Sequence, residues 1–265
     1  MSPLDELFAR TRAEHRAALI GYLPAGFPSH AGAVAAMTAM VAAGVDAVEV
    51  GLPYSDPLID GPTIAAAVDV ALAGGTRTAD VLRTVAEVAA TGAPALVMTY
   101  WNPVERYGAR RFAVDLRGAG GAGAITPDLP PEEATEWLAA AEEAGIDPVF
   151  LVAPSSKDER IARVASVSRG FLYAASTMGV TGARASMGER AADLVTRARR
   201  HTDLPIAVGL GVSTGAQAAE VAGYADGVIV GSAFVRRLLD APDEAAGVRA
   251  VTELTAELAM GARRT

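Results

Sequence analysis

The feature that most constrains the fold is a regular alternation of short apolar segments with longer stretches rich in Ala, Leu, Glu and Arg. Each apolar segment has the length and side-chain content of a buried strand, and each intervening stretch has the composition of an amphipathic helix. Eight candidate strands result, at 17–24, 47–53, 95–102, 122–130, 148–154, 171–176, 205–211 and 227–233. The predicted helices between them include 30–44, 131–145, 186–200 and 214–224.

Strands that are apolar along their whole length and separated by helices predict a parallel sheet covered by helices. Eight such units in 265 residues predict a (β/α)8 TIM barrel, here with an extra N-terminal helix. An open doubly wound sheet is the alternative, but the turn GYLPAGFPS after the first strand lacks the G-x-G-x-x-G pattern typical of that fold. No linker or shift in composition divides the chain, so residues 1–265 are predicted to form a single TIM-barrel domain.

Composition argues against several classes of protein. The net charge of −8 and the lack of a basic run interleaved with aromatic residues argue against nucleic-acid binding. Cysteine is absent, and His15, His30 and His201 are not spaced as ligands of one metal, so we predict no metal site. No segment reaches the ~18 apolar residues of a membrane helix. The charged, amphipathic N-terminal segment is unlike a signal peptide, so we expect a cytoplasmic protein without a membrane partner.

The single lysine limits the chemistry further. Imine-forming aldolases and enzymes that use pyridoxal phosphate (PLP) need a lysine in a desolvated pocket, where its pKa falls. Lys157 lies in the polar stretch SSKDER, which is typical of a solvated loop or first helical turn. We therefore predict that this chain holds no cofactor.

Glycine-rich loops follow the later strands, at the end of a barrel where active sites form. Barrels commonly bind phosphate through backbone N–H groups of the loops after strands 7 and 8, and glycine permits the close approach. Gly211 follows the seventh strand, and Gly231 and Ser232 follow the eighth. Gly182, in the loop after the sixth strand, is predicted to supply a fourth donor. These positions predict a phosphate-binding site.

Carboxylates at the second strand suggest acid–base chemistry. Glu49 stands between Val48 and Val50, so alternation places its side chain on the opposite face of the strand. If the valines face the helices, Glu49 points into the barrel, where partial burial raises its pKa and suits it to move protons. Asp60, in the following loop, is expected to be more solvated and ionised, and two such unlike carboxylates make a plausible pair. Asp56 fits an Asx turn as well as it fits a functional role.

The stretch VEVGLPYSDPLIDGPTI resembles the signature of the tryptophan synthase α subunit family. The segments MTYWNPVERYG, STMGVTGAR, VGLGVST and VGSAFV resemble further parts of that family along nearly the whole chain. The resemblance implies a carbon–carbon lyase that cleaves indole-3-glycerol phosphate to indole and glyceraldehyde 3-phosphate by a retro-aldol reaction.

The resemblance also implies roles for the predicted site residues. Glu49 is implied to move protons between indole C3 and the C3′ hydroxyl, and Asp60 to bind the indole N–H and stabilise the indolenine cation. Tyr173 is implied to pack near the substrate, and the glycines and Ser232 to hold its phosphate. Tyr22 and Tyr100 are predicted as further substrate-binding residues. Because a protonated indole ring accepts electrons itself, these groups would suffice without an imine or a metal.

The family resemblance implies a partner as well. The α subunit of that family docks on a PLP-dependent β subunit, which receives indole through a tunnel, and an α2β2 heterotetramer is expected. PLP is therefore expected on the β partner, for tryptophan biosynthesis. The loop with Asp56 and the segment around Asn102 and Pro103 are implied to face the β subunit.

Three positions depart from the family pattern, and two alternative functions stay open. Pro24, Phe27 and Thr177 differ from the residues expected near the rim of the pocket, which leaves the packing around indole open. A free indole-3-glycerol-phosphate lyase that works without a β subunit fits the same residues. Another phosphate-binding TIM-barrel isomerase is the second alternative, although it gives no reason for the 49–62 stretch.

Overall fold

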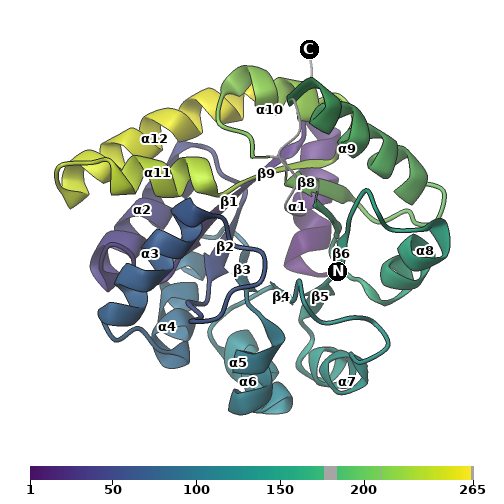
Figure 1. Cartoon of the computed structure of the whole chain (residues 1–265), viewed down its shortest axis with the longest axis horizontal. Coiled ribbons are helices and arrows are strands. Elements are labelled where there is room, and N and C mark those ends of the chain that lie inside the picture. The colour runs from purple at the N-terminus through teal and green to yellow at the C-terminus, as the bar shows by residue number, and fades with distance from the viewer. Residues whose placement is uncertain (176–183, 210, 264–265) are drawn as a thin grey trace.

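The computed structural model describes residues 1–175, 184–209 and 211–263, and its centre is a parallel barrel (Figure 1). The strands pair in the order β5-β4-β3-β2-β1-β9-β8-β7-β6, and every neighbouring pair is parallel. The two ends of this order, β5 and β6, are consecutive parts of one segment, which brings the ends of the sheet together into a nearly closed barrel. The strands are β1 (Ala18–Pro24), β2 (Ala47–Gly51), β3 (Ala95–Met98), β4 (Gly123–Ile125), β5 (Asp147–Val149), β6 (Leu151–Val152), β7 (Leu172–Ala175), β8 (Ile206–Gly209) and β9 (Gly227–Val230).

Helices surround the barrel, as the view down its axis shows (Figure 1). The prediction of a (β/α)8 TIM barrel with an extra N-terminal helix is confirmed. None of the helices in the described ranges is long and apolar enough to span a membrane. The helices are α1 (Pro3–Ala13), α2 (His30–Ala43), α3 (Pro62–Ala73), α4 (Thr78–Ala89), α5 (Trp101–Tyr107), α6 (Ala109–Gly118), α7 (Thr135–Ala144), α8 (Asp158–Val167), α9 (Arg184–Ala198), α10 (Gly215–Ala222), α11 (Ser232–Leu239) and α12 (Glu244–Gly261).

Several predicted strands, among them 95–102, 122–130 and 227–233, end earlier than their apolar sequences suggest, and the first of these shows why. The segment 95–102 was expected to be extended, but β3 ends at Met98 and α5 begins at Trp101. Asp128, in the loop after β4, explains the change. Its carboxylate accepts the Trp101 N–H at 2.9 and 3.1 Å, so it satisfies one of the free N–H groups at the start of α5.

Alternation along β2 divides its side chains between two environments. Val48 and Val50 belong to the hydrophobic cluster that joins the sheet to the surrounding helices. Glu49, between them, therefore points into the barrel. Its partner across the parallel pair is Tyr22 of β1. The sequence-based orientation of Glu49 is confirmed.

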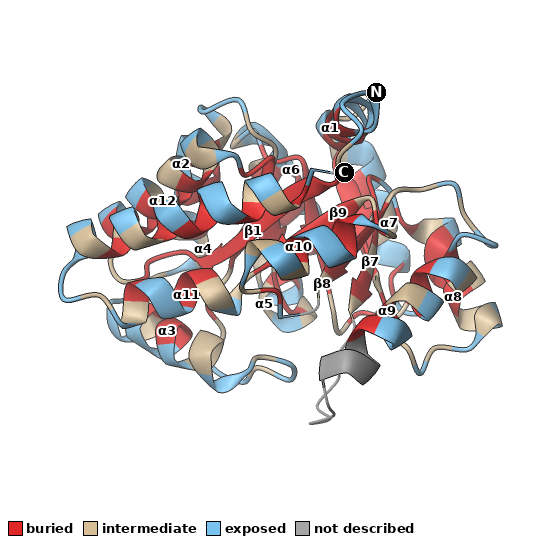
Figure 2. Cartoon of the chain, turned by 90° about the horizontal axis from the view of Figure 1, so that it is seen from above, coloured by how far each residue is buried: buried red, intermediate tan, exposed pale blue. Residues whose placement is uncertain are grey.

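The N-terminal helix closes the end of the barrel opposite the functional loops, and it projects from that end in Figure 2. Leu4, Leu7 and Phe8 pack inside the barrel with interior residues of the strands, and the Phe8 ring lies 5.7 Å from that of Phe171. A capping box at Ser2 stabilises the start of α1. Because this end is filled by apolar packing, a ligand can enter the barrel only from the carboxyl ends of the strands.

A buried ion pair fastens the same end. Asp46, just before β2, accepts two hydrogen bonds from Arg16, at 2.6 and 2.7 Å. It also accepts the Leu19 N–H at 2.9 Å and a bond from Arg10 at 3.2 Å. Asp46 thereby links α1, the turn that follows it and β1 to the start of β2.

Candidate active site

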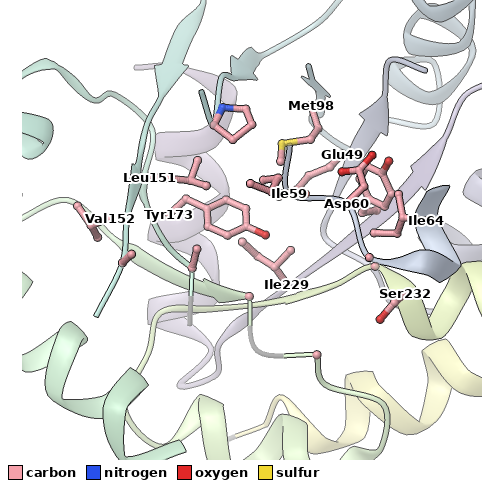
Figure 3. A pocket seen from close by; sticks show the side chains of 18 of the residues that line it. Glu49, Ile59, Asp60, Ile64, Met98, Leu151, Val152, Tyr173, Ile229 and Ser232 are labelled. Atoms are coloured by element: carbon pink, nitrogen blue, oxygen red, sulfur yellow. The ribbon is translucent and has the colours of Figure 1, made fainter. Parts of the chain in front are cut away.

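A cavity of about 570 Å³ opens at the carboxyl ends of the strands (Figure 3). This volume is in the range of small-molecule sites. Glu49, Asp60, Tyr22 and Tyr173 all line it, so the structure brings together four of the residues predicted from the sequence. The loop after β2 supplies Asp60, whereas the other three side chains come from the strands themselves.

Glu49 is a buried carboxyl group, and one of its oxygens has no hydrogen-bond partner among the described residues. Its side chain belongs to a residue that is 1% exposed, and no described residue makes a hydrogen bond to its Oε1. Burial raises the pKa of Glu49 to about 8, because no nearby donor or cation offsets the loss of water around the charged form. The burial is more complete than the partial burial expected from the sequence. A group with this pKa can both hold and release a proton near neutral pH.

Asp60 lies in a different environment, held by the loop rather than by a strand. Its Oδ1 accepts a hydrogen bond of 3.0 Å from the Tyr100 hydroxyl, which in turn accepts the Ile59 N–H at 3.1 Å. Partial burial raises the pKa of Asp60, while the bond from Tyr100 opposes that rise. Asp60 is therefore a fixed but accessible acceptor at the edge of the cavity. Shortly after it in the chain, Arg236 of α11 donates to the Thr63 hydroxyl at 2.5 Å and links the start of α3 to α11.

Tyr100 reaches the site only through Asp60. It is not among the residues that line the cavity, and its ring packs 5.5 Å from that of Tyr54. Burial raises the pKa of Tyr100 to about 12, so its hydroxyl stays a neutral donor to Asp60. In the structure the Tyr100 hydroxyl bonds to Asp60 and its ring packs against Tyr54, and its role in substrate binding stays a prediction.

Two tyrosines enter the cavity over glycines of neighbouring strands. A Cβ atom on Gly51 would stand 2.5 Å from the Tyr22 hydroxyl oxygen, and one on Gly209 would stand 2.6 Å from that of Tyr173. Burial raises the pKa of both tyrosines well above the usual value, so both hydroxyls stay protonated. In the view of Figure 3 the Tyr173 side chain points into the cavity from one side and Glu49 and Asp60 lie on the other. Glycine at these two strand positions gives the rings their room.

The predicted phosphate-binding positions lie on one wall of the cavity. Gly211, Gly231 and Ser232 line it together. Gly211 adopts a φ of 66°, which favours glycine, and Ser232 is the first residue of α11, where backbone N–H groups are free of intrahelical partners. Gly182 and Thr177 lie outside the described residues.

Several residues that line the cavity were not predicted from the sequence. Met98, Leu151 and Ile229 form apolar walls of the cavity (Figure 3), but in the sequence they look like any core residue of a strand. Arg160, in the first turn of α8, also lines the cavity. Arg160 follows the predicted strand 148–154 by six residues, at the end of the barrel where active sites form, and this position could have identified it. Lys157 and Asp56 are exposed and do not line the cavity.

Potential metal ligands are not clustered in the part of the chain that the structure describes. No group of three or more His, Asp or Glu residues there is arranged to hold a metal ion. The arrangement instead offers two carboxyl groups of different pKa, neutral phenols, apolar walls and backbone N–H groups.

Comparison with known proteins decides the family. The model of the family described as tryptophan synthase alpha chain matches residues 8–263. The chain belongs to the tryptophan synthase alpha chain family. It is 60% identical to the tryptophan synthase alpha chain of Streptomyces avermitilis over 98% of this chain and 94% of that protein. It is 56% identical to that of Mycobacterium marinum over 99% and 96% of the two chains.

Solved structures agree with this assignment. A crystal structure of tryptophan synthase from M. tuberculosis has a chain 52% identical to this one, with a TM-score of 0.92 and full coverage of both chains. Tryptophan synthase subunit alpha from Legionella pneumophila is 32% identical, with a TM-score of 0.89 and 98% coverage of both chains. The alpha chain of tryptophan synthase is a lyase that cleaves indole-3-glycerol phosphate, and the function predicted from the sequence is confirmed. The isomerase alternative is thereby set aside.

Two of the three departures from the family pattern, Pro24 and Phe27, lie away from the cavity. Pro24 is the last residue of β1, and Phe27 packs in the core between the sheet and the helices. Neither lines the cavity. The walls that would enclose an indole ring in this member of the tryptophan synthase alpha chain family are therefore made by other residues.

Proposed function

We propose that Glu49 and Asp60 perform the acid–base chemistry of indole-3-glycerol phosphate cleavage in this chain. The observation that supports this assignment most strongly is Glu49 itself, a buried carboxyl group that faces the cavity with Oε1 unbonded by any described residue. With its pKa raised to about 8 by burial, Glu49 is largely protonated at neutral pH and serves first as an acid.

The proton transfers balance with Glu49 alone. Protonated Glu49 gives its proton to indole C3, which converts the ring to an indolenine cation with the positive charge at the ring nitrogen. The resulting carboxylate then takes the proton of the hydroxyl on the side-chain carbon bonded to C3. The C–C bond breaks, its electrons return to the ring, and the aldehyde forms as Glu49 regains its proton. Burial makes Glu49 a stronger base than an exposed carboxylate, which favours the second transfer.

Asp60 acts on the other side of the ring in this proposal. Held by Tyr100 at 3.0 Å, its carboxylate accepts the indole N–H and stabilises the positive charge that develops there. Met98, Leu151 and Ile229 supply the apolar surface that such a ring requires. Tyr22 and Tyr173 complete the walls around it.

The phosphate is proposed to bind beside Gly211, Gly231 and Ser232, as a dianion that accepts hydrogen bonds from backbone N–H groups, including those at the start of α11. Gly182 is proposed to join them. This grip holds the far end of the substrate, so that binding energy from the phosphate positions the reacting carbon near Glu49.

The chain works with a partner. Tryptophan synthase alpha chains form a complex with the β subunit, and we propose an α2β2 heterotetramer in which PLP resides on the β subunit. Indole released here passes to that subunit for tryptophan synthesis. In this proposal residues 1–265 form one barrel domain. The domain holds no cofactor of its own, and the protein acts in the cytoplasm.

Indole release from indole-3-glycerol phosphate by the purified chain tests the assignment. The rate is measured alone and with a PLP-containing tryptophan synthase β subunit. We expect turnover in both states and a clear rise with the partner. Full turnover that the partner leaves unchanged would mean a free lyase, and no turnover in either state would overturn the proposal.

A further inference from the structure

Arg160 introduces positive charge into an otherwise acidic site. Of the described residues that line the cavity, it is the only one with a cationic side chain, whereas Glu49 and Asp60 are both carboxylic acids. The chain as a whole has a formal net charge of −8. A substrate that carries a phosphate dianion is repelled by such a protein unless a local positive charge offsets the field.

The first turn of α8 holds Arg160 at a fixed place on the rim. Arg197 of α9 donates to Asp158 at 2.9 Å and also to the backbone oxygen of Ser156, which anchors the segment that leads into the helix. The Arg160 side chain is 40% exposed. It lines both the main cavity and an adjoining hollow of about 180 Å³ beside Thr126. Arg160 is therefore exposed to solvent and borders the cavity at once.

Two acidic side chains lie near Arg160, and only one of them is bonded to it. Glu132, in the loop after β4, accepts a hydrogen bond of 2.6 Å from Arg160 Nη1. Asp128 lines the adjoining hollow, but its carboxylate accepts the Trp101 N–H with both oxygens. Glu132 is exposed, so this ion pair is open to competition from another anion.

We propose that Arg160 attracts the phosphate-bearing substrate into the cavity and that Glu132 weakens this attraction by competing for the guanidinium group. The inference rests on the proposed function, because that function supplies the dianionic substrate. Arg160 is a positioning residue here: it acts on capture of the substrate and leaves the proton transfers to Glu49. Lys157, three residues earlier, is exposed and does not line the cavity.

A purely structural role for the ion pair predicts a different pattern of mutant effects. If Arg160 and Glu132 only fasten two loops together, removing either partner breaks the same bond and has the same consequence. If Arg160 attracts substrate, removing Arg160 lowers capture, whereas removing Glu132 frees the guanidinium group and raises it. The sign of the Glu132 effect therefore separates the two roles.

The test compares kcat and KM for indole-3-glycerol phosphate in the full-length chain saturated with a tryptophan synthase β subunit. Arg160→Gln should lower kcat/KM about fivefold at low ionic strength, mostly through KM, as expected for one charge acting on a dianion through solvent. Glu132→Gln should raise kcat/KM about twofold. Both effects should shrink at roughly 0.5 M salt, where the Debye length is only several Å. Arg163→Gln is the matched control, because it removes the same charge from an exposed site one turn later on α8.

The proposal is overturned if Arg160→Gln and Glu132→Gln change kcat/KM in the same direction. It is also overturned if Arg163→Gln has the effect of Arg160→Gln, since the net charge of the chain would then be the cause. These outcomes are distinct from failure of the proposed function, in which the wild-type chain itself releases no indole. Thermal unfolding of each variant confirms that the fold is retained.

Discussion

Two buried carboxylic acids lie three residues apart in the sequence, at opposite levels of the barrel, and their surroundings differ completely. Asp46, at the closed end, is 8% exposed, and its carboxylate accepts hydrogen bonds from Arg16, Arg10 and the Leu19 N–H. Glu49, nearer the open end, is 1% exposed, and its Oε1 has no partner among the described residues. Among the described residues, the carboxylate of Asp46 therefore has several hydrogen-bond donors, whereas Oε1 of Glu49 has none.

The difference shows how one strand serves stability and chemistry together. A buried carboxylate with several donors and a guanidinium group is stabilised in its charged form and holds elements of the fold in place. A buried carboxyl group without donors retains its proton to higher pH and gains basicity, which suits proton transfer and costs stability. Burial alone therefore does not point to a role in proton transfer; it is burial at a cavity, with Oε1 unbonded by any described residue, that supports the role proposed for Glu49.

The largest expected effect is on turnover. Glu49→Gln keeps the shape of the side chain but removes the transferable proton, so we expect kcat for indole release to fall about 10³-fold. Asp56→Asn, a change of an exposed carboxylate in the loop after β2, is the control and should leave the rate of the chain alone within twofold. A Glu49→Gln variant that keeps more than a tenth of the activity would remove Glu49 from the mechanism.

The corresponding change at the closed end should affect stability instead. Asp46→Ala leaves the Arg16 guanidinium group without its buried partner, and the free energy of unfolding should fall by about 3 kcal/mol. Urea unfolding measures this change, and kcat at a temperature where the variant is folded should stay within twofold of wild type. Glu14→Gln removes the more exposed partner of the same arginine and should cost less than about 1 kcal/mol. Equal losses for the two variants would contradict the structural role of Asp46.

A smaller effect is expected at the support of Asp60. Tyr100→Phe removes the 3.0 Å hydrogen bond to Asp60, so the pKa of Asp60 should rise. As the pH is lowered, Asp60 should then become protonated at a higher pH than it does in the wild type. We expect kcat/KM at neutral pH to fall about tenfold, which corresponds to ~1.5 kcal/mol, the lower end of the range for a lost hydrogen bond to a charged group, and its acidic limb to move to higher pH. Tyr54→Phe removes the hydroxyl of the tyrosine whose ring packs against Tyr100 at 41°, and it should leave the pH profile unchanged. An unaltered acidic limb in Tyr100→Phe would show that this bond does not tune Asp60.

Much of the fold could be predicted because its signals are local and repeated. Apolar runs and helix composition located the segments that form the barrel, although the predicted strand 148–154 is divided into β5 and β6. Alternation around Val48 and Val50 gave the inward direction of Glu49. The end of β3 could not be predicted, because the helix that starts at Trp101 depends on Asp128, which lies far along the chain and meets it only in the folded barrel.

The candidate site was only partly readable from the sequence. Glu49 is conspicuous because it interrupts an apolar strand, and Asp60 because it follows in the loop at the end of that strand. Met98 and Ile229 follow the pattern of a strand and are distinguished only by the cavity they border. The absence of a hydrogen bond at Glu49 Oε1 is a property of the whole barrel, and no spacing in the sequence encodes it.

The most direct test of this account is the titration of the Glu49 side chain itself. Glutamate labelled with ¹³C at the side-chain carboxyl gives NMR signals that follow each group with pH, and the signal missing from Glu49→Gln belongs to Glu49. Because burial raises the pKa of Glu49, we expect that signal to stay protonated through neutral pH and to titrate at about 8. Titration near the ordinary glutamate value of ~4.3 would contradict the account, since Glu49 would then hold no proton to give to the indole ring at neutral pH.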